Sequence, residues 1–231
     1  RSATPRSEKM NATWAIVMKE VRIELRTKEI LVTAGLFGLL VVVLTSLAFF
    51  LDDTTSRRIA PGVLWIGASF AGVLAMGRSW AREREADAIR GQLLAPIPRN
   101  AIYAGKAIGT LVFVLAIDLV LLPVVGVLFR LELWPMLLPV GCILVFGTVG
   151  YVALGTLFAA MSVRTRARDL MLSVVLFPLS SPGILAGVVA TREVLGGGPL
   201  EETIAWLRIL AAFDLVAIVS GLVFFEPLMK D

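Results

Sequence analysis

Histidine is absent from this chain of 231 residues, and cysteine occurs once, as Cys142. The chain therefore lacks the commonest metal ligand and the commonest general acid and base at neutral pH. A single cysteine allows neither an intrachain disulfide nor a cysteine-based metal cage. A phosphate-binding loop is also missing, because Ala107 follows Gly105-Lys106 where that motif requires Ser or Thr. We expect no catalytic residue, metal site or cofactor on this chain; if ATP drives it, ATP and Mg²⁺ bind a partner subunit.

Charged residues are scarce, at 17%, whereas 58% of the residues are hydrophobic and the mean hydropathy is +0.86. Few water-soluble domains are so apolar, and this places the chain among membrane proteins. The net charge of +4 would also suit a nucleic-acid partner. We favour the lipid membrane and no nucleic acid, because the basic residues gather beside the apolar runs.

Six apolar runs are long enough to cross a bilayer, which takes roughly 20 residues. We predict an all-α membrane protein with one six-span domain over residues 30–231. Pro123, Pro178 and Pro182 lie inside two of the runs and are expected to bend or break those helices locally. The predicted spans cover residues 30–51, 60–80, 101–129, 135–163, 170–191 and 204–226.

Lysine and arginine are distributed unevenly between the two sides of these spans. Seventeen of the 22 flank one side and five flank the other. Cytoplasmic loops of membrane proteins carry the excess of Lys and Arg. We therefore predict that both termini are cytoplasmic.

The segment ahead of the first span is amphipathic. Apolar residues from Trp14 to Leu25 recur at helical spacing, and charged residues fill the remaining positions. We predict a helix over residues 14–29 that lies in the membrane surface, and a helix packed on a soluble partner is the alternative. Residues 1–13 are expected to be a flexible lead-in, with Met10 as a candidate natural start.

A charged segment between the second and third spans is the most informative stretch. It carries apolar residues at helical spacing, and Pro96 and Pro98 end it. A short surface helix held between two spans suits the transfer of force from a soluble partner, so we predict a cytoplasmic coupling helix over residues 82–94. The residues expected to dock this soluble partner are Arg82, Glu83, Arg84, Glu85, Asp87, Ile89, Arg90, Leu93 and Leu94.

Two carboxyl groups, Asp118 and Asp214, are expected inside spans. A charge at a helix centre costs about 2.5–3.5 kcal/mol on insertion scales, so each should face protein or water. Asp118 is either a polar patch in a pathway or a proton site, or a carboxyl satisfied by a neighbouring helix. For Asp214 we favour the second interpretation.

The fifth span is interrupted by Pro178, Ser181 and Pro182. Backbone groups that proline frees at membrane depth need protein or water as partners. We predict that this kink faces a cavity or an interface and is, with Asp118, a candidate for the interior polar lining of a substrate path.

Arg164, Arg166 and Arg168 precede that span in a predicted cytoplasmic turn. We expect them to set the topology and contact lipid phosphates, and a second contact with a soluble partner is the alternative. Small residues recur every four positions, as at Gly105 and Gly109, and predict ordinary close contacts between helices.

These features together resemble the permease subunit of a type-2 ABC exporter and, more closely, the CcmB family of haem exporter permeases in cytochrome c maturation. The opening Glu-Arg-Glu is shared by type-2 permeases generally, whereas the later matches discriminate in favour of CcmB. The matching segments are residues 83–96, 101–106, 155–160, 163–169 and 177–182.

The resemblance implies a homodimeric permease in the bacterial inner membrane. Its implied partners are an ATP-binding subunit like CcmA, a haem-handling membrane protein like CcmC, a single-span protein like CcmD and a haem chaperone like CcmE. The complex would export or deliver haem, or release the loaded chaperone. Without histidine this chain offers iron only Met, Tyr or Cys142, so we expect no lasting haem ligation by it.

Other functions stay open at this point. A type-2 permease could export lipids, drugs or polysaccharide instead. An ion-driven secondary transporter could use Asp118, although its coupling helix would then lack a purpose. A membrane-embedded enzyme is disfavoured, because the chain shows no catalytic set of residues.

Overall fold

The computed structural model describes residues 5–49, 53–85, 97–132, 134, 137–162 and 168–228. Within these ranges the chain forms seven helices and no strand. Six of the helices are long and apolar enough to cross a membrane, in agreement with the six predicted spans. The helices are α1 (Pro5–Thr27), α2 (Glu29–Ala48), α3 (Asp53–Glu85), α5 (Arg99–Leu128), α6 (Leu137–Ser162), α7 (Arg168–Gly196) and α8 (Leu200–Leu228).

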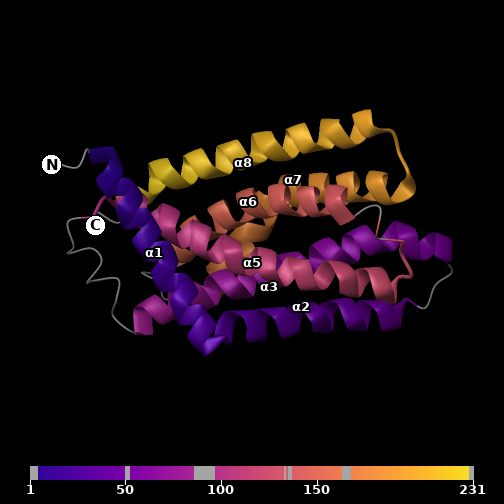
Figure 1. Ribbon diagram of the computed structural model, residues 1–231, viewed down its shortest axis with the longest axis horizontal. Coiled ribbons are helices and arrows are strands. Elements are labelled where there is room, and N and C mark those ends of the chain that lie inside the picture. Colours follow the sequence, from indigo (N-terminus) through magenta and orange to yellow (C-terminus); the bar gives the residue numbers. More distant parts are fainter. Residues whose placement is uncertain are drawn as a thin grey trace.

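The six long helices form a bundle in which successive helices run in opposite directions (Figure 1). Helix α1 crosses one end of this bundle obliquely, and the end of α8 lies at the same end (Figure 1). An even number of spans returns the chain to the side from which it started. The end of α3 and the start of α5 therefore lie near α1.

Small residues let the helices of the bundle approach closely. Ala71 and Ala75 of α3 are fully buried, and a Cβ on Gly67 would lie only 2.9 Å from Val42 in α2. Lipid supplies no hydrophobic force between helices, so close packing of this kind must hold them together. The outward faces of α2 and α8 carry exposed Leu, Val and Phe side chains, as lipid contact requires.

A tryptophan fills the centre of the bundle. Trp65 of α3 is 3% exposed, and its Nε1 donates a hydrogen bond of 3.0 Å to Thr191 Oγ1 in α7. A Cβ added at Gly147 or Gly187 would collide with the indole ring. The two glycines thus make the room for this ring between α6 and α7.

The prolines inside α7 do not interrupt the helix, which runs unbroken from Arg168 to Gly196. Pro182 leaves the carbonyl of Pro178 without its usual amide donor, and the Ser181 hydroxyl donates to that oxygen at 2.8 Å. Pro178, Ser181 and Pro182 are all exposed on the surface of this chain. Their predicted place in the interior is therefore corrected, because the freed carbonyl is satisfied locally; an interface with another chain stays a prediction.

Helix α1 begins earlier than expected. It starts at Pro5, so residues 5–13 continue the helix and the flexible lead-in predicted over residues 1–13 is too long. No glycine or proline follows within this stretch to end the helix. The helix ends at Thr27, and Lys28 takes a left-handed conformation with φ of 54° before α2 starts.

Candidate functional site

A cluster of charged side chains joins α1, α2, α3 and α5 where α1 crosses the bundle. Four are acidic and four are basic, so their formal charges balance. Within the described part of the chain this is the densest set of ion pairs between helices. We call the cluster the charged junction, and its members are Lys19, Glu20, Glu24, Glu29, Arg78, Arg82, Glu83 and Lys106.

Lys106 of α5 lies at the centre of the charged junction and is 1% exposed. Its Nζ is 3.1 Å from Glu20 Oε1 of α1 and 3.0 Å from Glu83 Oε1 of α3. It also donates to the Ser79 carbonyl at 3.2 Å and lies 5.3 Å from the centroid of the Trp80 ring. Two carboxylates from different helices thus share one buried ammonium group, and Lys19 of α1 pairs with both of them as a second cation. This arrangement fixes three helices relative to one another.

Arg82 and Glu24 form a second pair in the charged junction. Arg82 Nη2 donates to Glu24 Oε2 at 2.8 Å, and Arg82 Nε donates to Glu29 Oε2 at 3.3 Å. The other oxygen of Glu24 accepts the backbone N–H of Leu31 at 2.8 Å, so Glu24 also caps the first turn of α2. This one carboxylate, 1% exposed, ties together α1, α2 and the end of α3.

Two glycines of α5 let α1 lie close against it. A Cβ on Gly105 would lie 2.7 Å from Ile16 Cβ, and one on Gly109 would lie 3.0 Å from Glu20 Cβ. The small-residue face predicted at these positions is therefore a contact between α1 and α5. It brings Glu20 within reach of Lys106.

The apolar stripe of α1 divides between the bundle and the surroundings. Ile16 and Val17 are buried, whereas Trp14 is 62% exposed and Leu25 is 67% exposed. Met18 is exposed beside them. The acidic face carries Glu20 and Glu24 into the bundle, and the outward face combines these apolar side chains with the exposed Arg22 and Arg26.

The sequence interpretation did not foresee the roles of Glu20, Glu24 and Lys106. The sequence pattern places the two glutamates among the charged positions of an amphipathic helix, and it marks Lys106 only as part of an incomplete phosphate-loop pattern. Their spacing offered a signal, because Glu20 and Glu24 are one helical turn apart and so share one face of α1.

The predicted docking residues fall into three groups. Arg82 and Glu83 form the last turn of α3 with Arg84 and Glu85, and the first two turn inward into the charged junction. The side chains of Arg84 and Glu85 are not described. The remaining residues lie outside the described ranges, and these are Asp87, Ile89, Arg90, Leu93 and Leu94.

Most of the predicted arginine turn also lies outside the residues that the structure describes. Arg164 and Arg166 are outside the described residues, and Arg168 begins α7 with its side chain not described. Their proposed contacts stay predictions.

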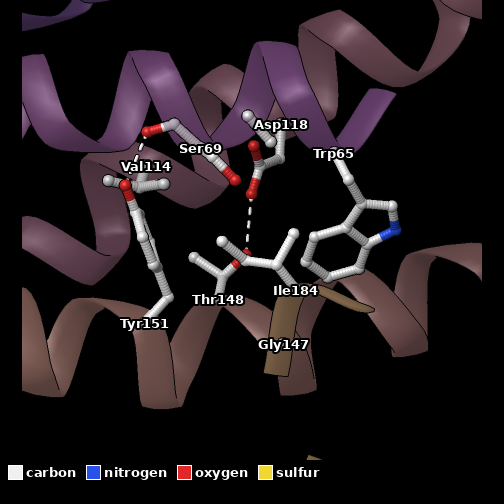
Figure 2. A pocket seen from close by; sticks show the side chains of 9 residues that line it. Trp65, Ser69, Val114, Asp118, Gly147, Thr148, Tyr151 and Ile184 are labelled. Carbon is white, nitrogen blue, oxygen red and sulfur yellow. Dashed lines mark hydrogen bonds between the residues drawn. The ribbon is translucent and has the colours of Figure 1, made fainter. Parts of the chain in front are cut away.

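Asp118 of α5 is 2% exposed and lies beside a small cavity at the centre of the bundle. Thr148 Oγ1 of α6 donates to Asp118 Oδ2 at 2.9 Å. Tyr151, one turn further along α6, donates its hydroxyl proton to the Ser69 carbonyl of α3 at 2.6 Å. Figure 2 shows the carboxyl group between α3 and Thr148, with the ring of Tyr151 on one side and Trp65 on the other.

Asp214 of α8 is satisfied by backbone, as favoured from the sequence. Its Oδ1 accepts the N–H of Gly150 in α6 at 2.9 Å, and the side chain is buried at 6% exposure. One turn of α6 therefore contacts two carboxyl groups, that of Asp118 through Thr148 and that of Asp214 through Gly150.

Comparison with known proteins identifies the family of this chain. A family model described as CcmB protein matches residues 11–225. The chain belongs to the CcmB family. It is similar to proteins named heme exporter protein B: 30% identical over 215 residues to that of Bradyrhizobium diazoefficiens, with 92% of this chain and 94% of the relative covered.

Two further relatives carry the same name. That of Paracoccus denitrificans is 30% identical over 207 residues, covering 88% of this chain and 92% of its own, and that of Pseudomonas aeruginosa is 27% identical over 222 residues, covering 92% and 96%. The match of this CcmB family member to its relatives includes α1, the charged junction and all six apolar helices. It is a multi-pass bacterial membrane protein.

Proposed function

We propose that this CcmB family member is the membrane permease subunit of a haem exporter that serves cytochrome c maturation, and that ATP hydrolysis by a separate subunit drives it. The relatives are named for haem export, and they match this chain over nearly their full lengths. The chain contributes the membrane pathway or the moving part, and the ATPase contributes the energy.

The observation that carries the coupling mechanism is the charged junction at the end of α3. Residues 86–94, the rest of the predicted coupling helix, follow Glu85 directly. The last turn of α3 is held to α1 by Arg82 and to α5 by Glu83. A displacement of the coupling segment by an ATPase that closes on ATP therefore moves three helices together as one rigid body.

Helix α1 adds a contact with the membrane surface. Its outward apolar residues, Trp14 and Leu25, suit the acyl boundary, and Arg22 and Arg26 suit anionic headgroups. With the termini in the cytoplasm, α1 and the charged junction lie on the inner leaflet, on the side where an ATPase binds. The inner membrane is the proposed location.

The proposed assembly contains two copies of this chain, CcmA-like ATPases, a CcmC-like haem protein, a CcmD-like single-span protein and a CcmE-like chaperone on the outer side. Haem is cargo of the complex or of its chaperone, and this chain holds none of it permanently. Force from the ATPase then serves either haem delivery or the release of the loaded chaperone.

Co-purification with the ATPase subunit in mild detergent tests the proposal. Charge reversal at Arg84, Glu85 and Arg90 should reduce the amount of ATPase recovered, because these residues belong to the predicted docking segment and the reversal places like charges against its partner. Arg57→Glu, at an exposed site at the opposite end of α3, is the matched control and should leave recovery unchanged. Equal recovery from both variants contradicts the docking assignment.

Deletion of the gene tests the cargo. Loss of holo c-type cytochromes, restored by the wild-type gene and not by the docking variant, supports a role in cytochrome c maturation. Normal cytochromes with altered lipid, glycan or drug export would instead identify another ABC exporter.

A further inference from the structure

The interior of the bundle holds a polar site that the coupling mechanism does not use. It is centred on Asp118 in α5, about 15 Å along the helix from Leu128 at 1.5 Å per residue, and thus well inside the span. One carboxyl oxygen, Oδ2, accepts the Thr148 hydroxyl at 2.9 Å. The other, Oδ1, is buried and has no hydrogen-bond partner among the residues that the structure describes.

The cavity beside this carboxyl group has a volume of about 10 Å³. That is close to the roughly 10–15 Å³ in which a single water molecule fits. The cavity is lined by the polar side chains of Ser69, Thr148, Tyr151 and Asp118 and by apolar ones that include Val114 and Ile184 (Figure 2). The space therefore accepts one small polar species and excludes a larger solute.

No basic group balances the carboxyl among the described residues that line this cavity. Helix α3 presents Ser69 and Trp65, α6 presents Thr148 and Tyr151, and α7 presents Ile184. The Tyr151 proton is already given to the Ser69 carbonyl, and Asp214 is bound to Gly150. An ionised carboxylate here would therefore be an unpaired charge inside the membrane, which is strongly unfavourable.

We propose that Asp118 and this cavity form a proton-binding site. The carboxyl group carries a proton on Oδ1, and this O–H donates a hydrogen bond to one enclosed water molecule. Oδ2 is then the carbonyl oxygen that accepts the Thr148 hydroxyl, so both oxygens are satisfied. The proton is taken up from bulk water as the carboxylate becomes a neutral acid. The bound proton removes the buried charge, and the Thr148 hydrogen bond between α5 and α6 is kept.

Infrared difference spectroscopy on the purified full-length protein in lipid nanodiscs tests this site at neutral pH. The wild-type spectrum should contain the C=O stretch of a protonated carboxyl, which shifts to lower frequency in D₂O, and Asp118→Asn should remove that component. Thr148→Val keeps the carboxyl and removes the donor to Oδ2, so the same band should move to higher frequency. Asp214→Asn is the matched control and should leave the Asp118 component in place.

Two results would overturn the proposal. One is a difference between wild type and Asp118→Asn that consists of carboxylate bands alone. The other is a melting temperature that rises with NaCl over choline chloride in the wild type and not in Asp118→Asn, because that behaviour identifies a sodium site. If Asp118→Asn does not fold, the wild-type and Thr148→Val spectra decide alone: a D₂O-sensitive C=O band that moves supports the site, and the absence of such a band or of its shift refutes it.

Discussion

Lys106 of α5 and Glu83 of α3 form a buried ion pair, with Nζ 3.0 Å from Oε1 and neither side chain more than 4% exposed. Glu20 of α1 approaches the same ammonium group at 3.1 Å. Removal of one member of such a set leaves its partners charged and buried, which is far more costly than the loss of a surface pair. The stability of the bundle at this end therefore depends on each member.

Lys106→Met should lower the free energy of unfolding by up to about 3–5 kcal/mol, because Glu20 and Glu83 lose their buried cation and keep only the partly exposed Lys19. Thermal unfolding in detergent, followed by intrinsic tryptophan fluorescence, measures the loss. Arg192→Ala is the control: its pair with Glu193 is 3.9 Å long and the arginine side chain is 56% exposed, so about 0–1 kcal/mol is expected. A similar melting temperature for both variants would show that the buried pair contributes little.

Glu24→Ala should destabilise the protein more than Glu29→Ala. Glu24 caps the first turn of α2 and pairs with Arg82, whereas Glu29 is 41% exposed. The lost cap alone costs about 0.5–2 kcal/mol, and the stranded Arg82 adds to it. Paired melting curves for the two variants provide the measurement, and the reverse order would remove Glu24 from its assigned role.

Gly105→Leu should detach α1 from α5, because a Cβ at this position already lies 2.7 Å from Ile16 and 3.0 Å from the Thr13 carbonyl. Trypsin should then cleave more rapidly after Arg22 and Arg26. Gly141→Leu is the matched control, since a Cβ at Gly141 meets no atom within 4 Å. Digestion in lipid nanodiscs, read by mass spectrometry, distinguishes the two; unchanged cleavage in Gly105→Leu would contradict the close contact.

Membrane topology offers a further test. The Lys and Arg bias predicts that both termini and residues 82–94 face the cytoplasm. After Cys142 is replaced by Ser, variants with a single cysteine at position 90 or 57 can be treated with a membrane-impermeant maleimide before and after lysis. Position 57 should react in cells freed of their outer membrane and position 90 only after lysis, and the opposite result would invert the orientation.

The sequence predicted the parts of this structure that depend on local pattern. Apolar length alone located the six spans, and the insertion cost of a charge marked Asp118 and Asp214 as groups in need of partners. Periodicity could not predict the charged junction, because Glu20, Glu83 and Lys106 lie far apart in the chain and meet only when α1 crosses α5. Each was interpreted from its own neighbours, and exposure was the default for a charged residue.

For the prolines of α7, the sequence suggested a distant partner where the structure has a local one. Proline chemistry correctly indicated freed backbone carbonyl groups, but the choice of partner was open. Ser181 supplies its hydroxyl to the Pro178 carbonyl from within the same turn, so no cavity is needed there. A hydroxyl in the same helical turn can thus donate to a backbone carbonyl that the sequence pattern suggested would need a more distant partner.

The position of the charged junction sets an order for biogenesis. The ribosome delivers Glu20 and Glu24 first, Arg82 and Glu83 after two spans, and Lys106 only as the third span begins. A nascent chain with two spans in the bilayer therefore holds more carboxylates than cations at this corner, and the insertion of α5 supplies the missing cation. Ribosome-bound intermediates shorter than this should stay accessible to membrane proteases, and longer ones should be protected.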